Sequence, residues 1–183
     1  MKEVLLYKFD NKWYQPAGLF KKTVWFFVNI LFFLNPISVY SPIKVWILIL
    51  FGAKVGRRVL IKPRVNIKYP WYLTIGDDVW IGEGVWIDNL TAVQLDSNVC
   101  ISQGAMLLTG NHNYKSESFD LILGSIVIEK GVWIGAKSVV CPGVTCKSHS
   151  ILTVGSVATK SLESYSIYQG NPAVKVRERV FNQ

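Results

Sequence analysis

The sequence predicts an all-β protein, a parallel β-helix built from hexapeptide repeats, with N-terminal amphipathic helices and one extended loop. Three observations support this prediction. Apolar residues recur at every sixth position after about residue 52, the chain before that point is basic and aromatic, and residues 106–127 interrupt the repeat. Half of the 183 residues are apolar, so the chain can fill the core of one domain and is not largely disordered.

Two runs of apolar or small residues carry the repeat. They are Ile75, Ile81, Ile87, Val93, Val99 and Ala105, and then Ile128, Ile134, Val140, Cys146, Leu152 and Ala158. Each hexapeptide forms one short strand and a turn, and three of them close a triangular coil of about 18 residues. Stacked coils cover one another's open faces. An antiparallel sandwich would instead alternate with period two. We therefore expect a helical segment over residues 1–51 and a β-helix domain with a C-terminal tail over residues 52–183.

The N-terminal segment contains a stretch without charged residues, residues 23–43, which as one helix would be about 31 Å long and could span a bilayer. Pro36 and Pro42 interrupt it. We therefore expect two short helices, about residues 19–34 and 42–51, each too short to span. Flanking lysines suit helices that lie in the plane of lipid headgroups, and packing on the β-helix is the alternative.

The charges are unevenly distributed. Residues 1–70 contain 12 basic and 2 acidic side chains, whereas residues 71–183 contain 8 and 10. This asymmetry favours an anionic partner, and the neighbouring aromatic residues favour a membrane surface over nucleic acid. We expect peripheral membrane contact through residues 19–51 and no bound nucleic acid. A secretory signal is not expected, because the apolar run begins too late and no small-residue cleavage site follows it. The expected location is cytoplasmic, at the inner face of the cytoplasmic membrane.

The histidines and cysteines narrow the chemistry. Two histidines cannot supply a three-histidine metal site within one chain, so no metal is expected. Three cysteines without a Cys-x-x-Cys pair indicate reduced thiols that pack at repeat positions. His112 lies in the interrupting loop, where a neutral imidazole can act as a general base, although a surface histidine without a role is the alternative. His149 lies in a repeat turn, and no role is predicted for it.

Eight segments of the sequence resemble a known family. They are residues 51–56, 65–71, 80–90, 107–112, 132–136, 141–144, 157–160 and 170–173. Together they resemble the left-handed β-helix (hexapeptide-repeat) acyltransferases, and among these the colanic-acid-type exopolysaccharide O-acetyltransferases. The resemblance runs from about residue 17 to 177.

The resemblance implies a homotrimer with its active site between adjacent subunits. It implies direct transfer of acetyl, in a ternary complex, from acetyl-CoA to a sugar hydroxyl of an exopolysaccharide or its lipid-linked precursor. By the same resemblance His112 is the catalytic base, and acetyl-CoA is bound by Trp133, Gly135, Ala136, Val154, Gly155, Thr159, Lys160 and Arg177. The family commonly has a basic residue after Asn-Pro-Ala, but here Val174 stands there and Lys175 follows, so no phosphate contact is assigned to Lys175.

The acceptor side is less specific. Asp88, Asn89 and Asn111 are candidate acceptor contacts, and for Asn89 closing a turn is the alternative. Trp80 and Trp86 each precede an inward residue, so they point outward and suit a subunit interface. Two other functions stay open at this point. One is N- or O-acyl transfer to a small soluble sugar or amino sugar, and the other is a non-catalytic β-helix scaffold.

Overall fold

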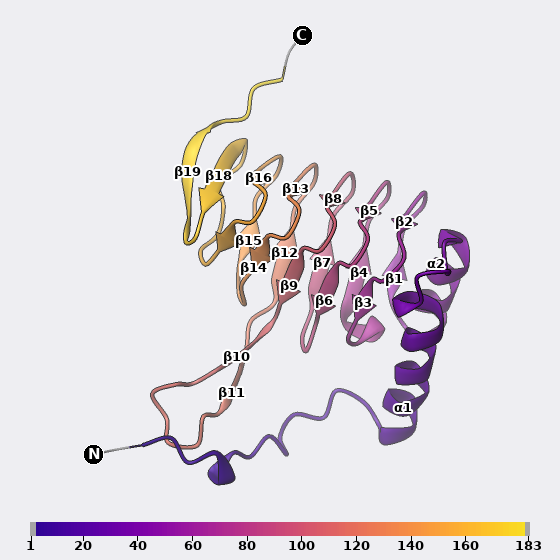
Figure 1. Ribbon diagram of the computed structural model, residues 1–183, viewed down its shortest axis with the longest axis vertical. Coiled ribbons are helices and arrows are strands. Elements are labelled where there is room, and N and C mark those ends of the chain that lie inside the picture. The colour runs from indigo at the N-terminus through magenta and orange to yellow at the C-terminus, as the bar shows by residue number, and fades with distance from the viewer. Residues whose placement is uncertain (1–2, 182–183) are drawn as a thin grey trace.

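The computed structural model describes residues 3–181, and it confirms the predicted fold class (Figure 1). Short parallel strands stack into three sheets that form the sides of a triangular prism. The first face contains β1 (Lys54–Val55), β4 (Leu73–Ile75), β7 (Val93–Leu95), β12 (Ile126–Ile128) and β15 (Thr145–Cys146). The second contains β2 (Leu60–Ile61), β5 (Trp80–Ile81), β8 (Cys100–Ile101), β13 (Trp133–Ile134) and β16 (Ile151–Leu152), extended by β18 (Ser166–Gly170) and β19 (Ala173–Glu178). The third contains β3 (Asn66–Ile67), β6 (Trp86–Asp88), β9 (Met106–Leu108), β14 (Val139–Val140) and β17 (Val157–Ala158).

Inward side chains form a buried ladder on each face of the prism. On the second face the ladder is Ile61, Ile81, Ile101, Ile134 and Leu152, each at most 1% exposed. Successive members are paired in register across the coils, so every coil covers the apolar end of the one before it.

The repeat shifts register once where the sequence suggested an unbroken run. Ile75 pairs with Leu95 rather than with Val93, because the turn after Ile87 is two residues longer than a hexapeptide allows. The turn after Ile67 is two residues longer as well, so the early coils place stacked residues 20 positions apart. The predicted spacing of 18 begins where Ile128 pairs with Cys146. Val93 is still buried, at the second inward position of its repeat.

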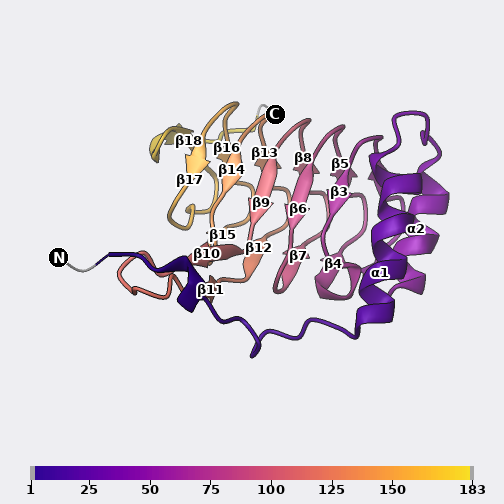
Figure 2. The same ribbon diagram turned by 60° about the horizontal axis from the view of Figure 1, so that its bottom comes forward.

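The N-terminal helices lie within one residue of the expected ranges. They are α1 (Leu19–Val28), which continues as the π-helical turn η2 (Asn29–Leu34), and α2 (Ser41–Leu50). Figure 2 shows both helices lying across the first coil. Phe33 and Leu48 are fully buried and belong to the same core as the β-helix, so the segment packs on the solenoid.

These helices close the open end of the prism. Backbone N–H groups of each coil bond to carbonyls of the next coil, which leaves the outer carbonyls of the first coil without a strand partner. Side chains of the helices supply the missing donors. The indole of Trp25 donates to the carbonyl of Ile67, and the ammonium of Lys44 donates to that of Lys62, both at 2.9 Å. The helices therefore supply hydrogen-bond donors to the carbonyls of the first coil, as a further coil would.

The exposed surface of the N-terminal helical segment is strongly apolar. Its exposed members are Leu19, Phe20, Phe26, Phe27, Ile30, Leu31, Leu34, Ile37, Val39, Tyr40, Ile43, Trp46, Ile49 and Leu50. Within residues 3–181, none of the helices combines the length and the apolar character that crossing a bilayer requires.

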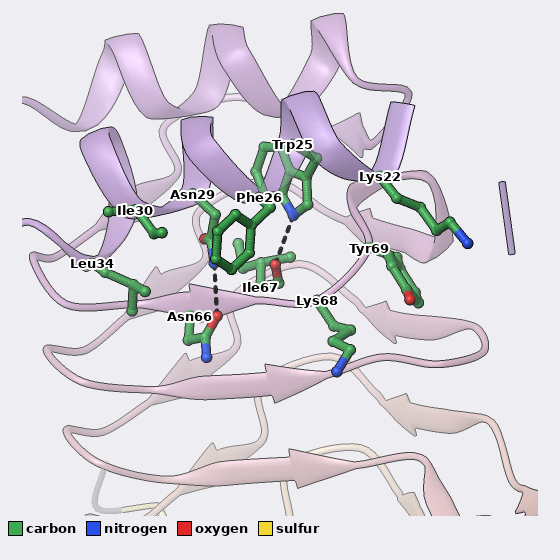
Figure 3. Close-up of a pocket in the computed structure, with 10 residues that line it drawn as sticks. All are labelled: Lys22, Trp25, Phe26, Asn29, Ile30, Leu34, Asn66, Ile67, Lys68 and Tyr69. Atoms are coloured by element: carbon green, nitrogen blue, oxygen red, sulfur yellow. Dashed lines mark hydrogen bonds between the residues drawn. The ribbon is translucent and has the colours of Figure 1, made fainter. Parts of the chain in front are cut away.

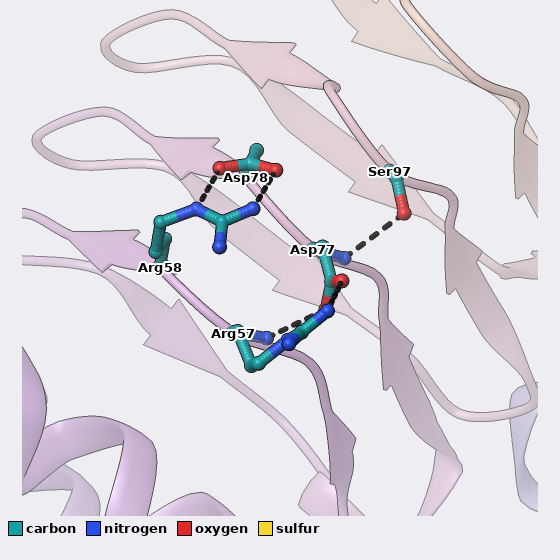
Figure 4. Close-up of polar contacts among 5 residues, drawn as sticks. All are labelled: Arg57, Arg58, Asp77, Asp78 and Ser97. Atoms are coloured by element: carbon teal, nitrogen blue, oxygen red, sulfur yellow. Dashed lines mark hydrogen bonds and ion pairs between the residues drawn. The ribbon is translucent and has the colours of Figure 1, made fainter.

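Part of the positive charge counted in the first 70 residues is neutralised by the second coil. Arg58 makes a two-point contact with Asp78 at 2.6 Å, and Arg57 contacts Asp77 at 3.3 Å (Figure 4). Arg58 holds the pKa of the Asp78 carboxyl below its usual range. The charge asymmetry along the sequence therefore overstates the unpaired positive charge on the surface. Of the positive charge that remains in residues 1–70, the lysines carry more than the arginines.

Candidate active site

The loop that interrupts the repeat is a β-hairpin that projects from the corner between the third and first faces (Figure 1). Its strands are β10 (Gly110–His112) and β11 (Leu121–Leu123), paired antiparallel. The N-terminal arm, residues 3–18, runs beside it and contains one 3-10 turn, η1 (Leu6–Lys8). The amide of Leu5 donates to the carbonyl of Glu117 at 2.8 Å, which fixes the arm to the hairpin tip.

His112 ends β10 and is held in one orientation by Phe119. The imidazole Nδ1 lies 2.8 Å from the carbonyl oxygen of Phe119, and the two rings stack at 4.3 Å with an angle of 6° between their planes. Because a carbonyl can only accept, Nδ1 carries the hydrogen of the neutral ring, and Nε2 keeps the lone pair. This tautomer leaves Nε2 as a possible base.

A hollow of about 490 Å³ adjoins the imidazole; we call it the histidine hollow. It is lined by Phe9, Asn11, Lys12, Tyr14, Gln15, Pro16, Lys22, Lys68, Tyr69, Leu90, His112 and Leu121. Half of these residues come from the N-terminal arm, which is anchored where the hydroxyl of Tyr14 donates to the carbonyl of Leu90 at 2.5 Å. Amides, hydroxyls and ammonium groups around an aromatic wall suit a polyhydroxylated ligand.

A second pocket of about 390 Å³ lies at the corner of the second and third faces; we call it the tryptophan pocket. Its walls are Ser102, Gln103, Trp133, Gly135, Ala136, Ile151, Leu152, Thr153 and Val154. The indole of Trp133 donates to the hydroxyl of Ser102 at 2.9 Å, which holds its ring along the surface. A Cβ on Gly135 would stand 2.6 Å from the amide nitrogen of Val154, so glycine is required there by close backbone packing.

Four of the eight expected donor-binding residues therefore share one pocket: Trp133, Gly135, Ala136 and Val154. Gly155 is exposed on the same turn as Val154. Thr159 and Lys160 are also exposed, but they follow β17 and lie where the chain passes from the third face to the first. Arg177 is exposed on β19. Lys175 is engaged by Glu163 at 2.8 Å and by Glu178 at 2.6 Å, which agrees with assigning it no phosphate contact.

The chain does not bring His112 to the tryptophan pocket. The two hollows share no lining residue. The hairpin leaves between β9 and β12, at the corner of the third and first faces. Trp133 and Gly135 lie where β13 passes to β14, at the corner of the second and third faces. Within one chain the imidazole and the pocket are thus on opposite edges of the third face.

Two of the acceptor candidates, Asn89 and Asn111, use their side chains to hold the backbone. Asn89 is fully buried, its Oδ1 accepts from the amide of Tyr69 at 3.0 Å, and its Nδ2 donates to the Tyr69 carbonyl at 2.6 Å. Both polar ends of the Asn89 side chain therefore close a turn, which is the alternative that the sequence left open for this residue. Asn111 is exposed, and its Oδ1 accepts from the amide of His112 at 2.8 Å.

Asp88 lies behind the histidine hollow. One of its carboxylate oxygens is buried without a hydrogen-bond partner in the described chain, and Lys68 approaches the same oxygen at 3.9 Å. Burial raises the pKa of the Asp88 carboxyl, and the nearby Lys68 opposes that shift only in part. Asp88 does not line the hollow itself.

The remaining predictions concern residues outside the site. Trp80 and Trp86 point outward as expected, 60% and 38% exposed. His149 occupies a turn with a φ of 60° and stacks on Tyr165, as suits a structural turn residue. Cys146 is fully buried, which raises the pKa of its thiol to about 12 and keeps it from acting as a nucleophile.

The contributions of Phe119 and of the N-terminal arm could not be read from the sequence. Phe119 has a φ of 52°, and nothing in the run 113–120 signals that its carbonyl turns back to His112. The arm joins the hollow through contacts with the hairpin more than 100 residues away in the chain, as in the pair Lys8–Glu117 at 3.3 Å. In the sequence, only the aromatic and polar residues of this arm indicate that it could line a binding site.

A β-helix with an imidazole on a corner hairpin and an apolar pocket on the next corner defines the class of hexapeptide-repeat acyltransferases. The chain is 36% identical over 169 residues to the protein named "Putative colanic acid biosynthesis acetyltransferase WcaF" of Escherichia coli (strain K12), covering 92% of this chain and 93% of that protein. It is 29% identical over 129 residues to galactoside O-acetyltransferase of the same organism, covering 69% and 64%.

Among solved structures, a hexapeptide-repeat acetyltransferase of Vibrio cholerae complexed with acetyl coenzyme A aligns with a TM-score of 0.81. That alignment has 18% identity and covers 91% of this chain and 93% of that chain, and it supports the fold. No protein-family model matches the chain. On the similarity to the Escherichia coli colanic acid biosynthesis protein, the chain belongs to the hexapeptide-repeat acetyltransferases.

Proposed function

We propose that the protein transfers acetyl from acetyl-CoA to a sugar hydroxyl of an exopolysaccharide or its lipid-linked precursor, with His112 as general base. The observation that carries this proposal is the Nδ1 contact with the Phe119 carbonyl, which leaves Nε2 basic beside a hollow with polar walls. Family membership supports an acetyltransferase and argues against a non-catalytic scaffold.

In the proposed reaction Nε2 takes the proton of the acceptor hydroxyl as its oxygen attacks the thioester carbonyl. A tetrahedral intermediate forms and then collapses with cleavage of the C–S bond. The thiolate of CoA leaves and receives the proton back from the imidazolium. The carbonyl of Phe119 accepts from Nδ1 throughout, and this hydrogen bond stabilises the imidazolium while it carries the extra proton.

The donor would lie along the tryptophan pocket. Trp133, Gly135, Ala136 and Val154 offer an apolar channel for the pantetheine arm. Gly155 extends this channel on the same turn as Val154. Thr159 and Lys160 on the turn after β17, and Arg177 on β19, are the further proposed donor contacts, and Lys160 and Arg177 offer positive charge to the phosphates of the nucleotide end. On the acceptor side Asn111 and Asp88 are the proposed contacts at the margin of the hollow, since Asn111 precedes His112 and Asp88 approaches Lys68.

A homotrimer would unite the two half-sites. His112 and the tryptophan pocket lie on opposite edges of the third face of one chain, so a neighbouring copy must supply one of them. The outward row Leu60, Trp80, Cys100 and Trp133 on the second face offers an apolar surface for that contact. We propose that the site forms between adjacent subunits.

The alternative acceptor is a small soluble sugar or amino sugar. The exposed apolar side of α1, η2 and α2 favours the larger substrate, because a soluble acceptor gives no reason for such a surface. We therefore also propose peripheral contact of this side with the inner face of the cytoplasmic membrane.

The central test is His112→Ala, measured as CoA release in the presence of acceptor. The variant should lose about 10²-fold to 10⁴-fold in turnover, the usual contribution of a general base, and still bind CoA. His149→Ala is the matched control and should retain its turnover. Near wild-type turnover of His112→Ala would overturn the assignment.

A further inference from the structure

The histidine hollow opens into a second depression, which we call the helix groove. The groove has a volume of about 300 Å³ and is lined by Lys22, Trp25, Phe26, Asn29, Ile30, Leu34, Asn66, Ile67, Lys68 and Tyr69. Three of these residues, Lys22, Lys68 and Tyr69, also line the histidine hollow. The two depressions are therefore neighbours with two lysines at their junction.

The groove is polar at this junction and apolar beyond it. Lys22, Phe26, Ile30 and Leu34 follow one another at intervals of four residues along α1 and η2, so they form one stripe on the helical segment. Figure 3 shows this stripe, with Lys22 at the end near Tyr69 and Leu34 at the far end. Phe26 is 58% exposed although it faces a groove, so its ring is available to an apolar ligand.

The charge at the junction is positive. Lys22 forms no ion pair within residues 3–181, and the only carboxylate paired with Lys68 is Asp88, at the long distance of 3.9 Å. Neither depression has a carboxylate among its described lining residues. Two ammonium groups that flank an opening between a polar hollow and an apolar groove suit a phosphate ester joined to an apolar chain.

We propose that the acceptor is a sugar carried on a lipid phosphate and that it is bound across both depressions; this inference rests on the proposed function. The sugar occupies the histidine hollow, the phosphate or diphosphate binds Lys22 and Lys68, and the start of the lipid chain lies on Phe26, Ile30 and Leu34. The chain then leaves along helices whose outer residues are apolar, where a membrane would receive the rest of it.

The binding of farnesyl diphosphate, measured by calorimetry, tests this arrangement without requiring the sugar. It combines an isoprenoid chain with a diphosphate, and inorganic pyrophosphate and farnesol supply each half alone. We expect farnesyl diphosphate to bind at least tenfold more tightly than either half. If pyrophosphate binds as tightly as farnesyl diphosphate, the groove does not bind the lipid chain and that part of the proposal is wrong. If farnesol binds as tightly as farnesyl diphosphate, the lysines do not bind the phosphate. If farnesyl diphosphate does not bind at all, both parts are wrong.

Paired variants locate the site. Lys22→Gln should weaken binding of farnesyl diphosphate about tenfold or more, the cost of a lost charge-assisted hydrogen bond. Lys21→Gln, which removes a lysine that lies over the Trp71 ring outside both depressions, should not weaken it. Phe26→Ser should remove the advantage of farnesyl diphosphate over pyrophosphate, whereas Phe27→Ser, an equally exposed neighbour at 57%, should not. Equal losses within either pair would mean nonspecific adsorption and would overturn the proposal.

The same preparations separate this inference from the proposed function. His112→Ala should bind farnesyl diphosphate as the parent does, because the imidazole takes no part in holding the phosphate or the chain. CoA binding, followed by thermal shift, should be unchanged in Lys22→Gln and Phe26→Ser. If CoA binds and His112 is essential but farnesyl diphosphate does not bind, the acetyltransferase stands and the lipid phosphate is wrong.

Discussion

The ring of Phe119 stacks on the imidazole of His112 while its own carbonyl accepts the hydrogen bond from Nδ1. One residue thus fixes both the plane and the tautomer of the imidazole. The ring of Phe9 from the N-terminal arm also approaches His112, at 5.6 Å between centroids. The proposed base is consequently in contact with both the hairpin that carries it and the N-terminal arm.

Phe119→Ala should lower turnover up to about tenfold, because an aromatic pair contributes about 0.5–1.5 kcal/mol and its loss frees the imidazole to rotate. The backbone carbonyl remains, so the loss should be much smaller than that of His112→Ala. Phe119→Tyr keeps the stack and is the matched control. Steady-state kinetics of the three variants check the order, and a Phe119→Ala enzyme as impaired as His112→Ala would contradict a positioning role.

Mixing two inactive variants should restore activity if the half-sites come from different subunits. His112→Ala lacks the base, and Ala136→Trp fills the tryptophan pocket that Ala136 lines. When equal amounts are co-expressed and assemble at random, about a quarter of the interfaces combine an intact base with an intact pocket. The expected turnover is that fraction of the parent value. Because each variant alone should be inactive, a mixture without activity would mean that base and pocket belong to one chain.

Much of the fold follows from local chemistry that the sequence displays. A period of six predicts the strands, and Pro36 and Pro42 predict where the helices break, because both effects act within a few residues. The sequence does not reveal the register shift after Ile87, since Val93 and Leu95 are both aliphatic and both buried. Only the pairing of Ile75 with Leu95 distinguishes the two.

The candidate site is less predictable from the sequence than the fold. His112 and the residues of the tryptophan pocket were identified through a family resemblance, and the contact to Phe119 depends on the turn of the hairpin. Lys22 and Lys68 are 46 positions apart and meet only because α1 lies across the first coil (Figure 3). Composition does not predict that the two lysines act together, because it shows them only as two of the 12 basic residues among residues 1–70.

Asp88→Asn should stabilise the protein at neutral pH. Burial raises the pKa of this carboxyl, so between its ordinary and its raised value the folded chain binds more protons than the unfolded chain. Stability therefore falls as pH rises through that interval, and the amide avoids this loss. Thermal unfolding from pH 3 to pH 7 should show the advantage of Asp88→Asn growing with pH and disappearing below the ordinary value. A variant less stable than the parent at pH 7 would show that Lys68 outweighs the burial of the charge.

Trp25→Phe tests whether the helices stabilise the β-helix by capping its first coil. The substitution keeps an aromatic ring against Phe33 and Phe51 but removes the indole N–H that donates to the Ile67 carbonyl. A buried acceptor left without a donor costs about 1–3 kcal/mol, so the midpoint of thermal unfolding should fall. Trp46→Phe is the control, because Trp46 is 62% exposed on α2 and its loss should change stability little. Equal effects of the two substitutions would mean that the helices contribute through general packing rather than through the carbonyls of the first coil.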